Sequence, residues 1–195
     1  FVCRALDSLI YGAYSKSRFM LVGTPSGISL APEGGAHQSI NPPLIAMGQP
    51  GLRHYEPAYV DELSVLMEEA LRLIQVPEGE SVYFRLTTRA VKQIARTDDR
   101  WREGAIKGAY WLREPGEGAE AAIVTMGALA SEALEGWEAM IDDLPGLGLL
   151  VVTSPDLLHR DWSACMAKQG AGASHVENLL AQLTPGASLV TLLDG

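Results

Sequence analysis

Residues 18–38 read RFMLVGTPSGISLAPEGGAHQ, and this stretch is the most informative feature of the chain. The apolar run at positions 19–22 predicts a buried strand. The segment after it is rich in glycine and proline, which predicts a long loop that carries one carboxylate, Glu33, and one imidazole, His37. Because α/β proteins place their chemistry on the loops at strand ends, we expect a functional site on this loop.

Around this stretch, helical and strand patterns alternate. Apolar residues at three- and four-residue spacing between positions 2 and 14 predict a first helix. The remaining expected helices lie at 40–47, 58–75, 128–144, 157–168 and 175–183, and the expected strands at 81–87, 108–113, 121–125, 147–152 and 188–193. Strands that are apolar throughout are typical of parallel sheets covered on both faces.

Residues 88–104 are polar and show no core pattern, so we interpret them as a linker. The expected fold is therefore α/β, with two partly complete three-layer units that contain mainly parallel sheets. We place the first unit at residues 1–95 and the second at residues 96–195.

Composition limits the possible partners. The chain has 195 residues, of which 47% are hydrophobic and 20% charged, and its net charge is −9. The negative charge argues against nucleic acid or an anionic membrane as a partner. Cys3 and Cys165 form no recognisable pair, and neither a signal peptide nor a membrane-spanning run is evident, so we expect a cytoplasmic protein.

The two ends suggest a piece of a longer protein. Phe1 begins inside an amphipathic helix without a capping residue, and the chain stops at Asp194-Gly195, where a loop after the last strand should start.

His37 together with Glu33 is the strongest candidate site in the sequence. A histidine on a glycine-rich loop can hydrogen-bond to a substrate oxygen or protonate it near neutral pH. The alternative is a surface histidine without a role.

Other polar residues leave alternatives open. Arg85 and Arg89 flank a strand end and could bind a carboxylate or phosphate, although a solvated or inter-subunit salt bridge is favoured. The polar residues 54–56 could line a site or belong to a strand edge. His159 and His175 are expected to be structural, and no set of residues has metal-ligand spacing.

These motifs resemble the transketolase-like family of thiamine diphosphate-dependent enzymes. LAPEGGAHQ at 30–38 is similar to that family's Gly-Glu-Asp-Gly-Pro-Thr-His-Gln loop in the pyrimidine-binding domain. GTPSG at 23–27, YEPAY at 55–59 and VYFRLTT at 82–88 look more like the homodimeric pyruvate dehydrogenase decarboxylating component. GAIKGAY at 104–110 resembles the start of that enzyme's C-terminal domain.

The resemblance implies roles for three residues. His37 would hydrogen-bond to the substrate oxygen, Glu33 would be a substrate-contacting acid, and Phe1 would belong to the aromatic cluster on the aminopyrimidine ring. The glutamate that activates the cofactor, and the domain that binds the diphosphate with a divalent metal such as Mg²⁺, would lie outside this chain. Arg89 aligns with a transketolase phosphate-binding arginine but not with the pyruvate dehydrogenase pattern.

The implied activity is decarboxylation of a pyruvate-type 2-oxo acid, with transfer of the acyl group to a lipoyl-bearing acyltransferase partner. Sites of this family form between subunits, so a homodimer is expected, and the fragment alone is expected to be inactive. The alternatives are a transketolase-type ketol transferase and a non-catalytic isolated domain.

Overall fold

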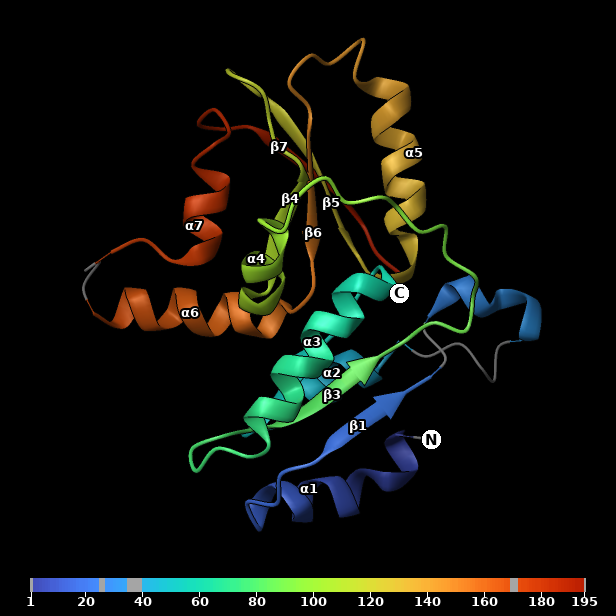
Figure 1. Ribbon diagram of the computed structural model, residues 1–195, viewed down its shortest axis with the longest axis vertical. Coiled ribbons are helices and arrows are strands. Elements are labelled where there is room, and N and C mark those ends of the chain that lie inside the picture. The colour runs from blue at the N-terminus through green and yellow to red at the C-terminus, as the bar shows by residue number, and fades with distance from the viewer. Residues whose placement is uncertain (1, 25–26, 35–39, 169–171, 195) are drawn as a thin grey trace.

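The computed structural model of the protein describes residues 2–24, 27–34, 40–168 and 172–194. These residues form two sheets with helices packed against them, and the C-terminus lies between the two sheets (Figure 1). The predicted α/β class with mainly parallel sheets is confirmed. The first sheet uses residues before the expected linker, and the second uses residues after it.

The first sheet has the strand order β1-β3-β2, and both of its pairings are parallel. Its strands are β1 (Met20–Gly23), β2 (Leu52–Tyr55) and β3 (Ser81–Arg85). Because all three run the same way, their carboxyl ends meet at one edge of the sheet, where β1 leads into the quoted loop.

Helices cover both faces of this sheet. Helix α3 (Val60–Leu73) packs Leu66 and Ala70 on one face, against Phe84 of β3. The 3₁₀ turn η1 (Val2–Ala5), α1 (Leu6–Tyr14) and α2 (Pro42–Met47) lie toward the opposite face, where the core consists of Leu9, Ala46, Leu52 and Tyr83. The expected helices at 2–14, 40–47 and 58–75 therefore form, with shorter bounds.

Strand β2 was expected only as one of the two interpretations of residues 54–56, the strand edge, and the structure bears out that interpretation for His54 and Tyr55. Only Arg53 among its residues is not buried, and at this edge of the sheet Arg160 donates from Nη2 to the Leu52 carbonyl at 2.9 Å. Its four residues, LRHY, include two with charged or polar side chains, which hid the strand from a search for apolar runs.

The second sheet has the strand order β4-β6-β5-β7. Strands β5, β6 and β7 are parallel, whereas β4 pairs with β6 in the antiparallel direction. The bounds are Ala109–Arg113 for β4, Ala121–Met126 for β5, Gly148–Val152 for β6 and Ser188–Leu192 for β7.

Helices lie on both sides of the second sheet (Figure 1). After the 3₁₀ turn η3 (Gly127–Leu129), α5 (Ala130–Met140) packs Ala133 against Ile123 and Leu149. On the other side, α6 (Pro155–Ala167) and α7 (His175–Leu180) pack Leu158 and Leu179 against Leu150.

The expectation that residues 88–104 lack a core pattern is wrong. The segment ends in α4 (Trp101–Lys107), and the Trp101 side chain is buried in a cluster that includes Tyr59 and Tyr110. Val91 and Ile94 also pack against this cluster. Apolar residues in an irregular segment have no period, so a periodicity search misses them.

Within the described residues, no helix combines the length and the apolar character that a membrane span requires.

Candidate functional site

Of the three residues predicted for the site, only Glu33 lies among the described residues, at the end of a short 3₁₀ helix. The loop after β1 contains η2 (Ile28–Glu33), which Glu33 closes. His37 and Phe1 lie outside the described residues, and the structure describes the backbone of Glu33 but not its side chain. The roles assigned to these three residues therefore stay predictions.

The start of this loop is fixed against the last strand of the other sheet. At Gly27, a Cβ atom would lie 1.7 Å from the backbone oxygen of Asp194, so only glycine fits. Asp194 follows β7 and is 1% exposed. The loop therefore runs directly against the C-terminal end of the second sheet.

Ser29 and Asp194 are joined by two hydrogen bonds. The Ser29 backbone N–H donates to Oδ1 of Asp194, and the Ser29 hydroxyl donates to Oδ2, both at 2.7 Å. Ser29 lies in the first turn of η2, where backbone N–H groups have no partner within the helix. A carboxylate from the second sheet thus caps a helix that belongs to the first.

Arg85 lies next to this contact and is buried. Its Nη1 donates to both carboxylate oxygens of Glu56 at 2.9 Å, and its Nη2 donates to the Asp194 carbonyl at 3.1 Å. Burial raises the pKa of the Glu56 carboxyl, and the Arg85 guanidinium opposes that shift. The favoured expectation of a solvated or inter-subunit bridge for Arg85 is wrong, because its ion pair is internal and its side chain is 1% exposed.

Glu56 also ties the first sheet to the second. Its backbone N–H donates to the Thr153 carbonyl, just after β6, at 2.8 Å. A Cβ atom on Gly127, after β5, would lie 2.3 Å from Oε1 of Glu56, and Gly127 has a φ of +63°. The carboxyl ends of the two sheets therefore face one another around a polar cluster of the half-buried Ser29 and the buried Glu56, Arg85 and Asp194, which we call the carboxyl-end cluster.

His54, the first of the polar residues 54–56, lies in the interior of the sheet. Its ring stacks on Tyr83 with centroids 5.5 Å apart, and it is 0% exposed. Neither ring nitrogen has a hydrogen-bond partner among the described residues. Burial, with a contribution from the Arg85 charge, lowers the pKa of His54 to about 4, so the ring is neutral at pH 7.

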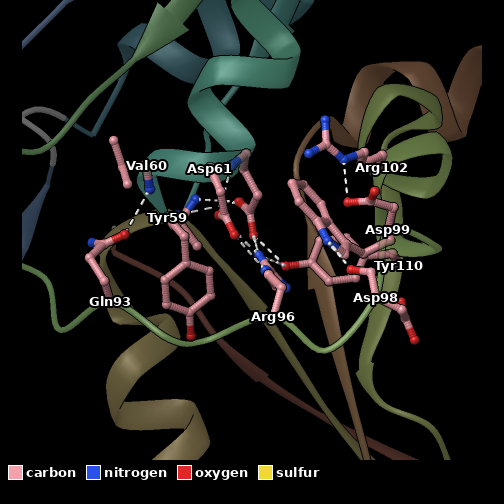
Figure 2. Close-up of polar contacts among 12 residues, drawn as sticks. Tyr59, Val60, Asp61, Gln93, Arg96, Asp98, Asp99, Arg102 and Tyr110 are labelled. Atoms are coloured by element: carbon pink, nitrogen blue, oxygen red, sulfur yellow. Dashed lines mark hydrogen bonds and ion pairs between the residues drawn. The ribbon is translucent and has the colours of Figure 1, made fainter.

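A second polar cluster surrounds Arg96 at the junction of α3, the linker and β4 (Figure 2). Arg96 donates from Nε to Oδ2 of Asp61 at 2.7 Å and from Nη2 to the Tyr110 hydroxyl at 2.9 Å. Its guanidinium carbon lies 4.3 Å from the centroid of the Trp101 ring. Stacking and hydrogen bonding together fix this arginine.

Glu62 is the buried acid of this second cluster. It accepts a hydrogen bond from the Tyr110 hydroxyl, one from Nη2 of Arg96 at 3.1 Å and one from the Ala58 N–H at 2.7 Å. Burial raises the pKa of its carboxyl, and these donors oppose the shift. All of the charged groups involved are paired with one another, which indicates a structural junction.

The other candidates have local partners. Arg89 forms an exposed ion pair with Glu132 of α5, inside the chain. His175 begins α7, and its Nε2 lies 2.8 Å from the Ala109 carbonyl. His159 lies exposed on α6, next to Ser163 and Trp162.

One groove of the described residues lies apart from the carboxyl-end cluster. A surface groove of about 670 Å³ runs along the edge strand β4, lined by residues that include Arg100, Trp111 and His175, and it contains no member of the carboxyl-end cluster. Within residues 2–24, 27–34, 40–168 and 172–194, no group of three or more His, Cys, Asp or Glu side chains could hold a metal ion.

Sequence reasoning missed Ser29, Asp194 and the pairing of Glu56 with Arg85. Two signals were present: an arginine at the end of an apolar strand, and an acid directly after another. Their pairing depends on how the two sheets meet, which no local pattern reveals.

The overall structure is similar to that of transketolases. The transketolase from Leishmania mexicana matches with a TM-score of 0.78 at 20% identity, over 99% of this chain and 26% of that one. The chain thus has the transketolase-like fold.

Sequence comparison points to a narrower group. The chain is 27% identical to the pyruvate dehydrogenase E1 component of Pseudomonas aeruginosa over 173 residues, which cover 83% of this chain and 19% of that protein. It is 27% identical to the same component of Mycolicibacterium smegmatis over 190 residues, which cover 91% and 20%. No family model matches the chain.

These comparisons confirm the resemblance to the thiamine diphosphate-dependent transketolase-like family, including the pyruvate dehydrogenase decarboxylating component. The chain spans about a fifth of the length of these two relatives.

Proposed function

We propose that this chain is part of the decarboxylating component of a pyruvate-type 2-oxo acid dehydrogenase. The observation that carries the proposal is the position of residues 27–34, the described part of the loop. It follows β1 at the edge where the carboxyl ends of both sheets meet, and its η2 helix is held there by Asp194. The similarity to pyruvate dehydrogenase E1 components supports this choice of reaction.

In this proposal the loop residues act on the substrate. His37 donates a hydrogen bond to the oxygen of the 2-oxo acid, because an imidazole can donate and accept protons near neutral pH. Glu33 contacts the substrate as an acid at the end of η2. Phe1 packs against the aminopyrimidine ring of the cofactor.

The proposed cofactor is thiamine diphosphate with a divalent metal such as Mg²⁺. When bound, it supplies the electron sink that decarboxylation of a 2-oxo acid requires. The described residues fit a supporting role toward it, because the buried acid Glu56 at the carboxyl ends of the strands is already paired with Arg85. The diphosphate and its metal are then held by parts of the protein outside this chain.

Exposed apolar residues support an assembly around the first sheet. Tyr14 and Tyr11 on α1 are 82% and 71% exposed, Leu44 on α2 is 65% exposed, and Val22 on the edge strand β1 is 53% exposed. Apolar side chains gathered on adjoining elements favour burial against another protein surface. We assign this surface to contacts with the rest of the full-length protein and with a homodimer partner. The proposed acyl acceptor is a lipoyl-bearing acyltransferase, and the proposed location is the cytoplasm.

A transketolase-type ketol transferase is the second candidate, because solved transketolases share the fold. The arginine that aligns with a transketolase phosphate-binding residue, Arg89, is paired with Glu132 instead. This pairing favours the 2-oxo acid over a sugar phosphate. A non-catalytic domain is the remaining alternative.

A substrate comparison tests the proposal. The full-length protein is supplied with thiamine diphosphate and Mg²⁺ and offered either pyruvate or a ketose phosphate with an aldose acceptor. The proposal predicts carbon dioxide release from pyruvate that depends on thiamine diphosphate, and no ketol transfer. Ketol transfer would establish the second candidate, and failure to retain thiamine diphosphate would favour the non-catalytic one.

A further inference from the structure

We infer that Asp194 and Ser29 form a clamp through which the second sheet positions the loop segment Ile28–Glu33. This inference rests on the proposed function for the role of that loop, but the clamp itself can be tested without any activity. Asp194 is a positioning residue in this account, because it acts on the loop and not on a reacting atom.

The first step in the argument is the geometry of the contact. Ser29 and Asp194 are 165 residues apart in sequence, yet both oxygens of one carboxylate are engaged by one residue at 2.7 Å. Hydrogen bonds to a charged acceptor are shorter and stronger than neutral ones. Since Asp194 is 1% exposed, water competes little for them.

The second step is that Asp194 is itself held in place. Its carbonyl accepts from Nη2 of Arg85 at 3.1 Å, and Arg85 is fixed by its two 2.9 Å bonds to Glu56. Gly27 fits against the same carbonyl only because it has no side chain. The clamp therefore joins the ends of β2, β3 and β7 to the segment after β1.

The third step connects the clamp to the site. Ser29 and Glu33 lie in the same short helix, Ile28–Glu33, so the position of Ser29 sets the path of the backbone to Glu33. Without the carboxylate, the first turn of η2 would lose its cap and the helix would open more often. The second sheet thus takes part in the site although none of the predicted site residues belongs to it.

The test uses four variants of the full-length protein. Ser29→Ala removes one of the two hydrogen bonds, and Ser29→Thr keeps both donors. Asp194→Asn removes the charge and leaves one acceptor oxygen, because the amide NH2 group cannot accept a hydrogen bond. Thr184→Val is the matched control, since it removes a hydroxyl hydrogen bond of 2.8 Å to the Ala119 carbonyl within the second unit. Each variant is measured for amide hydrogen exchange in residues 28–33, for the thermal unfolding midpoint, and for kcat and KM with pyruvate.

The clamp predicts that Ser29→Ala and Asp194→Asn speed exchange in residues 28–33 by about tenfold or more, as expected for loss of a charge-assisted hydrogen bond. Thr184→Val and Ser29→Thr should both leave exchange in this segment as slow as in the unaltered protein. If the loop is the active site, kcat falls in the two clamp variants while the unfolding midpoint stays close to that of the control.

Each contrary result is decisive. Unchanged exchange in both clamp variants would overturn the clamp, whatever the activity. Faster exchange with unchanged kcat would overturn its positioning role. If the unaltered protein has no activity with pyruvate, the proposed function fails, and the exchange data still decide whether the clamp exists.

Discussion

Arg85 and Glu56 form a buried ion pair in which one guanidinium nitrogen donates to both carboxylate oxygens at 2.9 Å. The two side chains are 1% and 2% exposed and extend from neighbouring strand ends. Removing both charges from water offsets much of their attraction, so such a pair contributes little net stability. Removing one partner alone has a different effect, because it leaves the other charge buried without its ion-pair partner.

We predict that Arg85→Met destabilises the protein by about 3–5 kcal/mol, the cost typical of leaving a buried charge unpaired. The double variant Arg85→Met/Glu56→Leu should recover part of this loss, because neither charge of the pair then remains buried without its partner. Denaturant unfolding measures both effects. Arg100→Met is the control, because the Arg100 side chain is 77% exposed. A double variant as unstable as the sum of its single variants would show that the pair is not coupled.

His54 should make the protein sensitive to mild acid. Its pKa is about 4 in the folded state, below the ordinary value of 6.5, so the unfolded state binds more protons between these values. The lowered pKa of His54 contributes about 3 kcal/mol to the free energy of unfolding. This contribution is fully present above pH 6.5 and is lost as the pH falls through 4. Unfolding free energies measured from pH 7 to pH 4 test this sign.

His54→Phe serves as the comparison in that experiment, since it keeps a ring against Tyr83 and removes the titrating group. Its stability should decline less steeply with acid than that of the unaltered protein. His159→Gln, at an exposed position, should leave the profile as it is. Parallel profiles for His54→Phe and the unaltered protein would contradict the assignment.

Arg96→Lys should destabilise the protein by about 2 kcal/mol, because lysine cannot reproduce the planar, multiply hydrogen-bonded and stacked guanidinium. Because lysine keeps the positive charge, the loss of stability measures the contribution of the guanidinium geometry to the contacts drawn in Figure 2. Arg102→Lys is the matched control, since Arg102 forms an ion pair with Asp99 while its side chain is 51% exposed. Equal decreases in the thermal unfolding midpoint for the two variants would mean that the contacts of Arg96 stabilise the protein no more than an exposed ion pair does.

Residues 1–195 alone should not bind thiamine diphosphate tightly. In the proposed function, the groups that hold the diphosphate, the metal ion and the activating glutamate lie elsewhere in the protein. Titration calorimetry of the isolated chain with thiamine diphosphate and Mg²⁺ should therefore show no affinity in the micromolar range. Micromolar binding would overturn the assignment of this chain to a partial site.

The main strands and helices could be predicted from the sequence where apolar residues recur at a regular spacing or form a continuous run. The run FMLV predicted a strand correctly, but its expected burial is wrong, because β1 is an edge strand whose Val22 is 53% exposed. The strand at 81–85 is buried throughout, as expected for a central parallel strand. Strand β2 was left as one of two interpretations because its buried histidine and its arginine look polar. Ile94 was missed because it lies in an irregular segment that has no period, and Trp101 because α4 begins among charged residues.

The carboxyl-end cluster could not be predicted for another reason. Ser29 meets Asp194 only once both sheets have formed and their carboxyl ends face each other. The sequence does identify the loop that this contact holds, through its glycines, Glu33 and His37. It does not reveal that the last residues of the second unit fix that loop.

The most direct test of the central claim is the turnover of His37→Ala in the full-length protein, with pyruvate and thiamine diphosphate, compared with His159→Ala. The account predicts that His37→Ala loses about 100-fold or more in kcat, as expected for a residue that transfers a proton or hydrogen bond in the reaction. The unfolding midpoint should not change, because a loop histidine contributes little packing. Turnover equal to that of His159→Ala, or a loss of activity that matches a loss of stability, would contradict the claim that this loop is the active site.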